Sequence, residues 1–466
     1  MSGLFHSLNS SVMALNAHSR ALETAGKNLA NVNNPAYARQ RVIYGDRGTV
    51  ITAAGAESLG TEALGVQQLR DALLDRQVMR ESALSAAVTA EQGGYQRAQA
   101  ALGQGIDRAA AAGTGASGIA AALDGFFNAF HGFAIRPTDS GERQSLLQAS
   151  AILTDRVQLA DRRLALVQAD LAAEVANDVA DVNRLLATVA ELNAQIGRFE
   201  LNAPGSAVDL RDQRQARLEE LAAKLPVELR DQPGGSVQVV AQDGGGADLV
   251  LVDRASVAGA VTFDGVQLSG GSPAIVLAPA AGAIKGLLTA RDGAVQTLRH
   301  DLDLLARQLV TSVNAAYNPT GATGDFFAPA GTTAGTLALA GSLTATNLKA
   351  SDGGPAGENT VALAVARLGT RGFSTAAGDV LDGTFGGFFS QGVGKLGQAL
   401  SGANARVDDQ GNIERLIRSQ RDALSGVSLD EKMADLMKYQ RAFQASSRVF
   451  QAVDELLDAV VNRLGR

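Results

Sequence analysis

Residues 4–32 read LFHSLNSSVMALNAHSRALETAGKNLANV, and residues 429–464 read LDEKMADLMKYQRAFQASSRVFQAVDELLDAVVNRL. Both stretches carry an apolar residue at every seventh position, which places one narrow stripe along a helix. The repeating residues are Leu8, Leu15, Leu22 and Leu29 in the first stretch and Leu429, Leu436, Phe443, Phe450, Leu457 and Leu464 in the second. Such a stripe is typical of a helix that packs on another helix. We therefore predict that the two ends of the chain pair with each other, or with the ends of neighbouring subunits.

A second row of positions runs beside each stripe. Its members are Leu4, Ser11, His18, Ala25 and Val32 near the start, and Tyr439, Ser446, Val453 and Val460 near the end. One stripe alone would indicate an ordinary intramolecular helical core. Two stripes at opposite ends of the chain favour assembly.

Composition excludes several classes of function. The chain has 466 residues, a net charge of -7 and a pI of about 5.3, whereas a nucleic-acid partner calls for a clustered basic face. Cysteine is absent, so disulfides and thiolate metal sites are excluded. No run approaches the roughly 18 apolar residues of a membrane span, so we expect no membrane insertion. Because Arg20 is the first basic residue and polar residues interrupt the opening stretch, we also expect no cleavable secretory signal.

The pattern between the two ends is mainly helical, with a β-rich insertion. Helical periodicity covers 3–29, 67–102, 119–133, 140–201, 209–225 and 283–317, returns near 358, and runs again over 396–424. Residues 226–279 alternate as strands do and are cut by turn signals such as Asp264-Gly265. Residues 45–65 read as irregular, and 318–355 as loops and short strands. The last helix should begin at Ser428, with Glu431 at capping-box spacing. The expected class is α+β, mainly α.

No motif for catalysis is convincing. Gly113-Thr114-Gly115-Ala116-Ser117-Gly118 spells a dinucleotide-binding loop, but an Ala-rich helical run precedes it where a strand is required, so we interpret it as a helix–helix connector. None of the histidines His6, His18, His131 and His300 has metal-site spacing. We predict no catalytic residue, no cofactor and no metal, and therefore a protein that is not an enzyme.

Two further motifs carry a family resemblance. Residues 30–40 read ANVNNPAYARQ, which is similar to the A-N-x-x-T-P-G-Y-x-R-Q signature of bacterial flagellar axial proteins. Residues 425–445 resemble the S-G-V-N-L-D-E-E…Y-Q…A-Y-Q-A ending of the same family. The matching residues are Asn31, Pro35, Tyr37, Arg39, Gln40, Leu429, Asp430, Tyr439 and Gln440. Asn34 and Ala36 depart from the signature at its usual Thr and Gly. Loss of that Gly would make a left-handed backbone less comfortable at Ala36.

The resemblance extends over nearly the whole chain and points to a junction member of the family. Leu210-Arg211-Asp212-Gln213-Arg214, Gly286-Leu287-Leu288 and Gly324-Asp325-Phe326-Phe327 resemble that member, whereas the hook protein is mostly β between its ends and flagellin lacks the Asn-Pro-Tyr signature. The resemblance implies a structural adaptor at the hook–filament junction that polymerises through its terminal helices. The alternatives are another rod, hook or junction protein and, in a different class, a cytosolic coiled-coil scaffold.

Partners, location and domains follow from the same resemblance. It implies self-association in a ring, contact with the hook protein and with a second junction protein or the filament, an export chaperone on the C-terminal helix, and secretion to the extracellular flagellum. The contacts inside the ring should come from Leu8, Leu15, Leu22, Leu29, Leu436, Phe443, Phe450 and Leu457. The predicted domains are a terminal coiled-coil domain (1–40 and 425–466), a helical rod (41–225, 284–317 and 354–424) and an outer β-rich domain (226–283 and 318–353).

Overall fold

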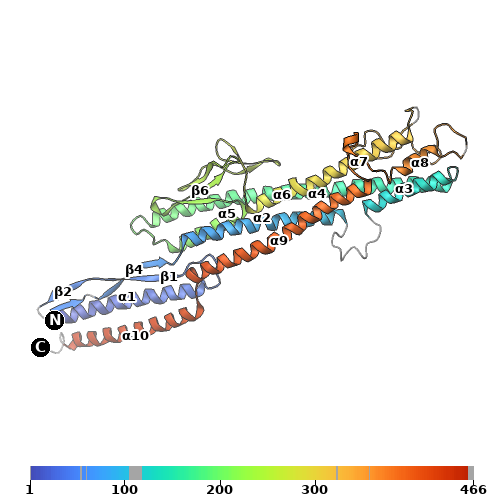
Figure 1. Ribbon diagram of the computed structural model, residues 1–466. Helices are drawn as coiled ribbons and strands as arrows, with labels where there is room; N and C mark the ends of the chain where they lie inside the picture. The colour runs from blue at the N-terminus through green and yellow to red at the C-terminus, as the bar shows by residue number, and fades with distance from the viewer. Residues whose placement is uncertain are drawn as a thin grey trace. The chain divides into compact units, whose positions relative to one another are not determined.

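The computed structural model describes residues 2–52, 55–58, 60–103, 118–321, 324–355 and 357–459. They fold into two compact units, the first made of residues 1–85, 180–282 and 410–466 and the second of residues 86–179 and 283–409. Three long helices, α2 (Ala72–Leu102), α4 (Ser140–Phe199) and α9 (Phe385–Ser425), contribute residues to both units. Long helices with small antiparallel sheets confirm the predicted class (Figure 1). The division into three functional domains stays a prediction.

The first unit contains both chain ends as a helix pair. Helix α1 (Ser2–Ala30) and helix α10 (Leu429–Asp458) lie side by side and run in opposite directions (Figure 1). As predicted, α10 begins after Ser428, whose side-chain oxygen accepts a hydrogen bond from the Glu431 backbone N–H at 3.5 Å. The two ends of the chain therefore pair within one molecule.

A β-ribbon packs against α1. Strands β1 (Gln40–Asp46) and β4 (Thr61–Gln68) pair antiparallel, with a bulge between Ile43 and Tyr44, and both contact α1. A short hairpin of β2 (Thr49–Thr52) and β3 (Gly55–Ser58) lies between them in sequence. The expectation of irregular structure over 45–65 is therefore wrong. Gly45, Asp46 and Gly48 are turn-type residues, but pairing Gly45 with Glu62 continues the ladder through them.

The β-rich module of this unit confirms the strand pattern of 226–279. Strands β5 (Glu228–Asp231), β6 (Val237–Gln242), β7 (Asp248–Asp253) and β8 (Ser256–Val257) form one antiparallel sheet in sequence order. A second sheet has the order β11 (Ile275–Leu277), β10 (Leu268–Gly270), β9 (Thr262–Phe263). The Asn193 amide of α4 donates to the Val237 and Arg254 carbonyls at 2.8 and 2.7 Å. The module follows α5 (Val208–Lys224) and is fastened to the end of α4.

The second unit is a helical bundle with an aromatic core. Its helices are α3 (Ile119–Ile135), α6 (Gly282–Ala290), α7 (Gln296–Tyr317), α8 (Thr360–Arg367) and the parts of α2, α4 and α9 that belong to it; a π-helical turn, Arg291–Val295, joins α6 to α7. Phe126 lies between Phe130, Phe326 and Phe327 at ring-centroid distances of 5.1 to 5.8 Å. Although aromatics make up only 4% of the chain, they concentrate here. In 318–355, the described residues form turns and one isolated bridge, Phe327 to Leu339, so the expectation of short strands there is wrong.

The seven-residue pattern of α4 describes its core face. Leu164, Leu171, Val175, Val182 and Val189 are fully buried. Phe199 continues the repeat in sequence but is 63% exposed, because α4 ends there and the chain turns away. The helix expected over 396–424 begins earlier, at Phe385, despite four glycines between 386 and 394. Burial of Phe385 and Phe389 outweighs the low helix propensity of those glycines.

Candidate assembly site

The predicted contact residues of α1 are only half covered in the single chain. Leu8, Leu15, Leu22 and Leu29 are all of intermediate exposure. The buried positions of α1 are instead small or polar side chains: Ser11, Ala17, Ala21, Thr24, Ala25 and Asn28. Small side chains let α10 and the β-ribbon approach the helix backbone closely. The second row of the sequence pattern, with Ser11 and Ala25, thus lies deeper than the leucine row.

Helix α10 keeps a large apolar surface exposed. Val453 and Leu457 are buried, and Leu436 and Phe450 are of intermediate exposure, while Phe443 is 37% exposed. At the start of the helix, Leu429, Met433 and Met437 are spaced four residues apart and are 52%, 47% and 54% exposed. Residues at this spacing share one helix face. We call these three residues the α10 stripe, and nothing in the described part of this unit covers it fully.

The signature 30–40 joins α1 to the β-ribbon through one buried amide. The Asn28 side-chain oxygen accepts hydrogen bonds from the Tyr37 hydroxyl and the Gln40 backbone N–H, both at 2.9 Å. Its amide nitrogen donates to the Gln40 carbonyl at 2.8 Å. Burial, together with the nearby Asp212 and Asp209 carboxylates, raises the pKa of the Tyr37 hydroxyl, which keeps it a proton donor. The direction in which the chain leaves α1 is therefore fixed by Asn28, Tyr37 and Gln40.

Arg39 ties the same segment to the C-terminal part of the unit. Its backbone N–H donates to the Ser425 carbonyl at 2.7 Å, where α9 ends. Its guanidinium lies 3.2 Å from the Glu431 carboxylate in α10 and 3.3 Å from the Leu424 carbonyl. One residue of the signature thus contacts both α9 and α10. We name Asn28, Tyr37, Arg39 and Gln40 the signature clamp.

Buried charged residues hold the backbone of the segment that contains the signature clamp. Arg70 donates to Asp75 at 3.0 Å, to Asp212 at 2.7 Å and to the Ala36 carbonyl at 2.8 Å. Because burial outweighs the attraction of Arg70, the pKa values of the Asp75 and Asp212 carboxyls are raised. Arg421, also buried, donates to the Pro35 carbonyl at 2.9 Å and pairs with Glu219. The turn around Pro35 is therefore held by two guanidinium groups, one from the segment between β4 and α2 and one from α9.

The described residues contain neither a membrane-spanning helix nor a metal-binding cluster. Within the ranges that the structure covers, no helix combines the length and the apolar character needed to cross a membrane. Among those same residues, no three His, Asp or Glu side chains gather as a metal site would require. The dinucleotide-like motif 113–118 lies outside the described residues except for Gly118, which precedes α3.

Comparison with known proteins places this arrangement in a family. A model of the flagellar hook-associated protein FlgK helical domain matches residues 104–327, and one of the flagellar basal body rod FlgEFG protein C-terminal region matches 418–464. A solved structure, the flagellar hook junction protein FlgK from Burkholderia pseudomallei, is 18% identical, with a TM-score of 0.46 over 54% of this chain and 46% of that chain.

Full-length relatives decide the matter. Flagellar hook-associated protein 1 of Bacillus subtilis is 25% identical over 100% of this chain and 99% of its own length. The protein of the same name from Escherichia coli is 23% identical over 98% of this chain and 99% of its own length. The chain belongs to the flagellar hook-associated protein 1 family. It is therefore a structural component of the flagellum, and the prediction that it is not an enzyme is confirmed.

In this member of the hook-associated protein 1 family, the signature departures at Asn34 and Ala36 fit without strain. The Asn34 side-chain oxygen accepts from the Ala36 N–H at 3.2 Å, and its carbonyl accepts from the Tyr37 N–H at 3.1 Å. Of the non-glycine residues that the structure describes, Arg254 alone has a positive φ. Ala36 therefore does not adopt the left-handed backbone that the replacement of Gly was expected to disfavour. The asparagine side chain closes the turn by accepting the hydrogen bond from the Ala36 N–H.

Sequence reasoning missed the supporting residues of the site. Asn28, Arg70 and Arg421 lie outside the stretches that carry the family resemblance, and Asp212 lies inside one of them but was given no role. One signal was available: Asn28 is a polar residue directly before Leu29, the last leucine of a seven-residue repeat. The partners of Arg70 and Arg421 lie far away in sequence, so no local pattern could reveal them. Predicted residues Asn31 and Asn34 bond mainly to each other and to nearby backbone.

Proposed function

We propose that this chain is a structural adaptor at the junction between flagellar hook and filament, and that it polymerises by packing its terminal helices against those of neighbouring copies. One observation carries the proposal. The terminal pair α1–α10 buries one side of each helix and leaves the α10 stripe and Phe443 exposed. Contiguous exposed apolar surface on a folded protein marks an interaction site. The names of the relatives, all hook-associated, supply the place in the flagellum.

Energetics favour such packing. Complete burial of a Leu, Met or Phe side chain stabilises by roughly 1.5–3 kcal/mol. The α10 stripe is about half exposed, so its burial contributes on the order of 2–5 kcal/mol to each contact before association costs. The half-exposed leucines of α1 add to this. A ring in which each subunit makes the contact twice doubles this gain, which then offsets part of the cost of association.

Partners and location complete the proposal. The ring contacts the hook on one side and a second junction protein or the filament on the other, outside the cell. Before export, a dedicated chaperone holds α10, because the α10 stripe is the apolar surface that needs cover. Within this proposal, residues 1–40 and 425–466 are the assembly domain, and the β-rich module of 226–283 faces solvent. The segment 318–353 does not join that outer module, because Phe326 and Phe327 lie in the core of the second unit.

Immunoelectron microscopy tests the junction assignment. Antibody raised against residues 226–283 should label isolated flagella in a single band where hook meets filament. Label along the whole hook or filament would reassign the chain to another axial position. Bare flagella with antigen only inside cells would instead support a cytosolic scaffold. The matched control is a strain without this protein, which should give no label.

A further inference from the structure

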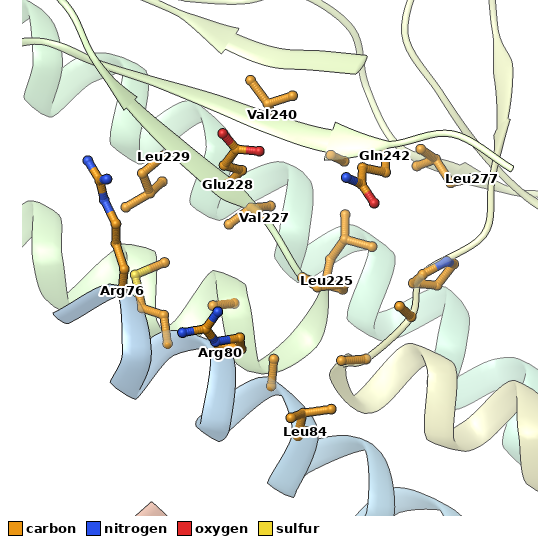
Figure 2. Close-up of a pocket in the computed structure, with 18 of the residues that line it drawn as sticks. Arg76, Arg80, Leu84, Leu225, Val227, Glu228, Leu229, Val240, Gln242 and Leu277 are labelled. Atoms are coloured by element: carbon orange, nitrogen blue, oxygen red, sulfur yellow. The ribbon is translucent and has the colours of Figure 1, made fainter. Parts of the chain in front are cut away.

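An apolar groove in the first unit has no role in the terminal contact. It has a volume of about 610 Å³ and lies between α2, the segment from the end of α5 into β5, strand β6 and residues 277–281 (Figure 2). Its apolar lining includes Leu73, Leu84, Leu225, Leu229, Val240 and Leu277. The volume is that of a site for several aliphatic side chains. All of its lining residues belong to one compact unit.

Two arginines line one side of the groove, and the carboxylate of its lining, Glu228, pairs with Arg230 at 3.1 Å. Arg76 and Arg80 both project from α2 along the groove (Figure 2). Arg76 forms an ion pair with Asp231 at 3.2 Å. Arg80 has no ion-pair or hydrogen-bond partner among the described residues. An occupant that fits both features presents aliphatic side chains for the apolar lining and a carboxylate for Arg80. That carboxylate should have no partner in its own chain and should lie about one helical turn from the aliphatic side chains.

The same chain presents a surface of that kind on α9. Ile413, Leu416 and Leu424 are 46%, 58% and 53% exposed and lie on one side of the helix. Asp409 is four residues before Ile413, on the same face, and no described residue pairs with it. We call Asp409, Ile413, Leu416 and Leu424 the α9 face. Its aliphatic side chains suit the apolar lining of the groove, and its negative charge is opposite to that of Arg80.

Two other exposed apolar surfaces match less well. Phe199 and Leu201 are exposed at the C-terminal end of α4, but the carboxylate between them, Glu200, accepts hydrogen bonds from Arg211 at 2.8 and 2.7 Å. The α10 stripe adjoins the α1–α10 pair and serves the terminal contact proposed above. Of these three surfaces, the α9 face alone combines exposed aliphatic side chains with a carboxylate, Asp409, that no described residue pairs with and that is free of the terminal contact.

We propose that the groove of one subunit receives the α9 face of a second copy, with Arg80 of one copy paired to Asp409 of the other. Because groove and face are different surfaces, the contact is head-to-tail, and repeating it generates a ring or a helical lattice. It deepens the proposed junction function by naming a second subunit–subunit contact, independent of the terminal helices.

Cysteine cross-linking in flagella tests the contact. Since the chain has no cysteine, introduced thiols are the only ones. Single variants Leu84→Cys and Leu416→Cys are co-expressed in a strain that lacks the native protein, and hook–junction preparations are treated with a short bifunctional maleimide. A dimer that persists after reduction, and that forms only when both variants are present, supports the contact. The control pairs Leu84→Cys with Ile135→Cys, a strongly exposed site of the second unit, and should give no dimer.

Charge exchange makes the test specific. Arg80→Glu should reduce the cross-linked dimer at least tenfold, and the double variant Arg80→Glu with Asp409→Arg should restore it. Thermal unfolding of each purified variant checks that the fold is kept. If Leu84→Cys instead cross-links to Leu201→Cys, the occupant is the α4 end and the inference is wrong.

A normal junction band without any dimer to position 84 would overturn this contact while leaving the proposed function intact. Loss of the junction band in unmodified protein would instead contradict the proposed function itself.

Discussion

A single asparagine determines how the N-terminal helix joins the rest of its unit. Asn28 is buried and makes three hydrogen bonds, to the Tyr37 hydroxyl and to both backbone groups of Gln40. A buried polar group that loses its partners costs roughly 1–3 kcal/mol in stability. Since removal of Asn28 leaves several such groups unpaired, the clamp depends on this residue more than on any exposed residue of the signature.

We expect Asn28→Ala to lower the free energy of unfolding by about 2–4 kcal/mol, because the Tyr37 hydroxyl and the Gln40 backbone would be left buried without partners. Urea denaturation followed by circular dichroism measures this. Asn31→Ala is the matched control: its amide donates to the Lys27 carbonyl in an exposed setting, so its effect should stay within about 0.5 kcal/mol. Equal effects of the two substitutions would contradict the clamp.

Glu200 makes stability depend on pH in an identifiable range. Hydrogen bonds from Arg211 lower the pKa of this carboxyl from its ordinary value of 4.5 to about 2. A carboxyl with a lowered pKa binds fewer protons in the folded state than in the unfolded chain. Its contribution to stability is therefore complete above pH 4.5 and is lost as the pH falls toward 2.

Glu200→Gln should accordingly cost about 1–3 kcal/mol at pH 7 and progressively less as the pH falls below 4.5. Unfolding free energies of both proteins at pH 7 and pH 3 measure the difference. Glu220→Gln removes an exposed pair with Arg217 and should change stability by less than about 0.5 kcal/mol at either pH. A Glu200→Gln effect that does not vary with pH would refute this origin.

Sequence patterns predicted some of the residues of the signature clamp but not the residues that support it. The signature identified Tyr37, Arg39 and Gln40, because family motifs preserve residue identity at fixed spacing. It did not reveal Arg70 or Arg421, whose bonds to the Ala36 and Pro35 carbonyls depend on chain segments that only the fold brings together. The predicted assembly residues from Leu8 to Leu457 stay predictions, since a single chain does not test contacts between copies.

At the scale of elements, helix crossings depend on where small residues lie. In the second unit, a Cβ atom at Gly286 of α6 would lie 2.0 Å from the Ala87 carbonyl oxygen of α2. Only glycine lets the two helices approach this closely. The sequence predicted a helix over 283–317. It did not show that Gly286 faces another backbone, because a glycine in a helical pattern indicates only a low helix propensity at that position.

Gly286→Ala should therefore destabilise the protein by about 1–3 kcal/mol through overpacking. Gly125→Ala provides the matched control: Gly125 lies in α3, is exposed and has open space at its Cβ position, so alanine there should stabilise by about 0.5–1 kcal/mol. Thermal denaturation of the two variants measures both signs. A stabilising Gly286→Ala would show that the crossing relaxes freely.

Long, strongly periodic elements were the ones that the sequence predicted well. Helix α4 was expected over 140–201 and spans Ser140–Phe199. Short strands without alternation, such as β2 and β3, were missed because hydrogen bonding to a neighbouring strand, and not side-chain pattern, defines them. The groove was invisible to sequence reasoning for a related reason: four separate segments line it.

At the scale of the whole molecule, we expect deletion of residues 429–466 to prevent assembly without unfolding the rest of the protein. The deletion removes α10 but spares Ser425, so the Arg39 backbone bond to the end of α9 remains, and Asn28, Tyr37 and Gln40 keep their bonds. It removes the Glu431 partner of Arg39, an exposed pair of small value. We expect the truncated protein to keep its β module and second unit folded, and to leave cells without junctions or filaments.

Amide hydrogen exchange and a motility assay measure these two outcomes. Exchange protection in α4 and β6 should be unchanged, while α1 should lose protection because α10 no longer covers it. A full-length variant with Leu429, Met433 and Met437 all replaced by Gln is a more specific test. It keeps the α1–α10 pair and removes only the α10 stripe. It too should abolish motility if the stripe makes the contact between copies. Normal motility in that variant, with the junction band in place, would mean that terminal packing uses the half-buried leucines of α1 alone.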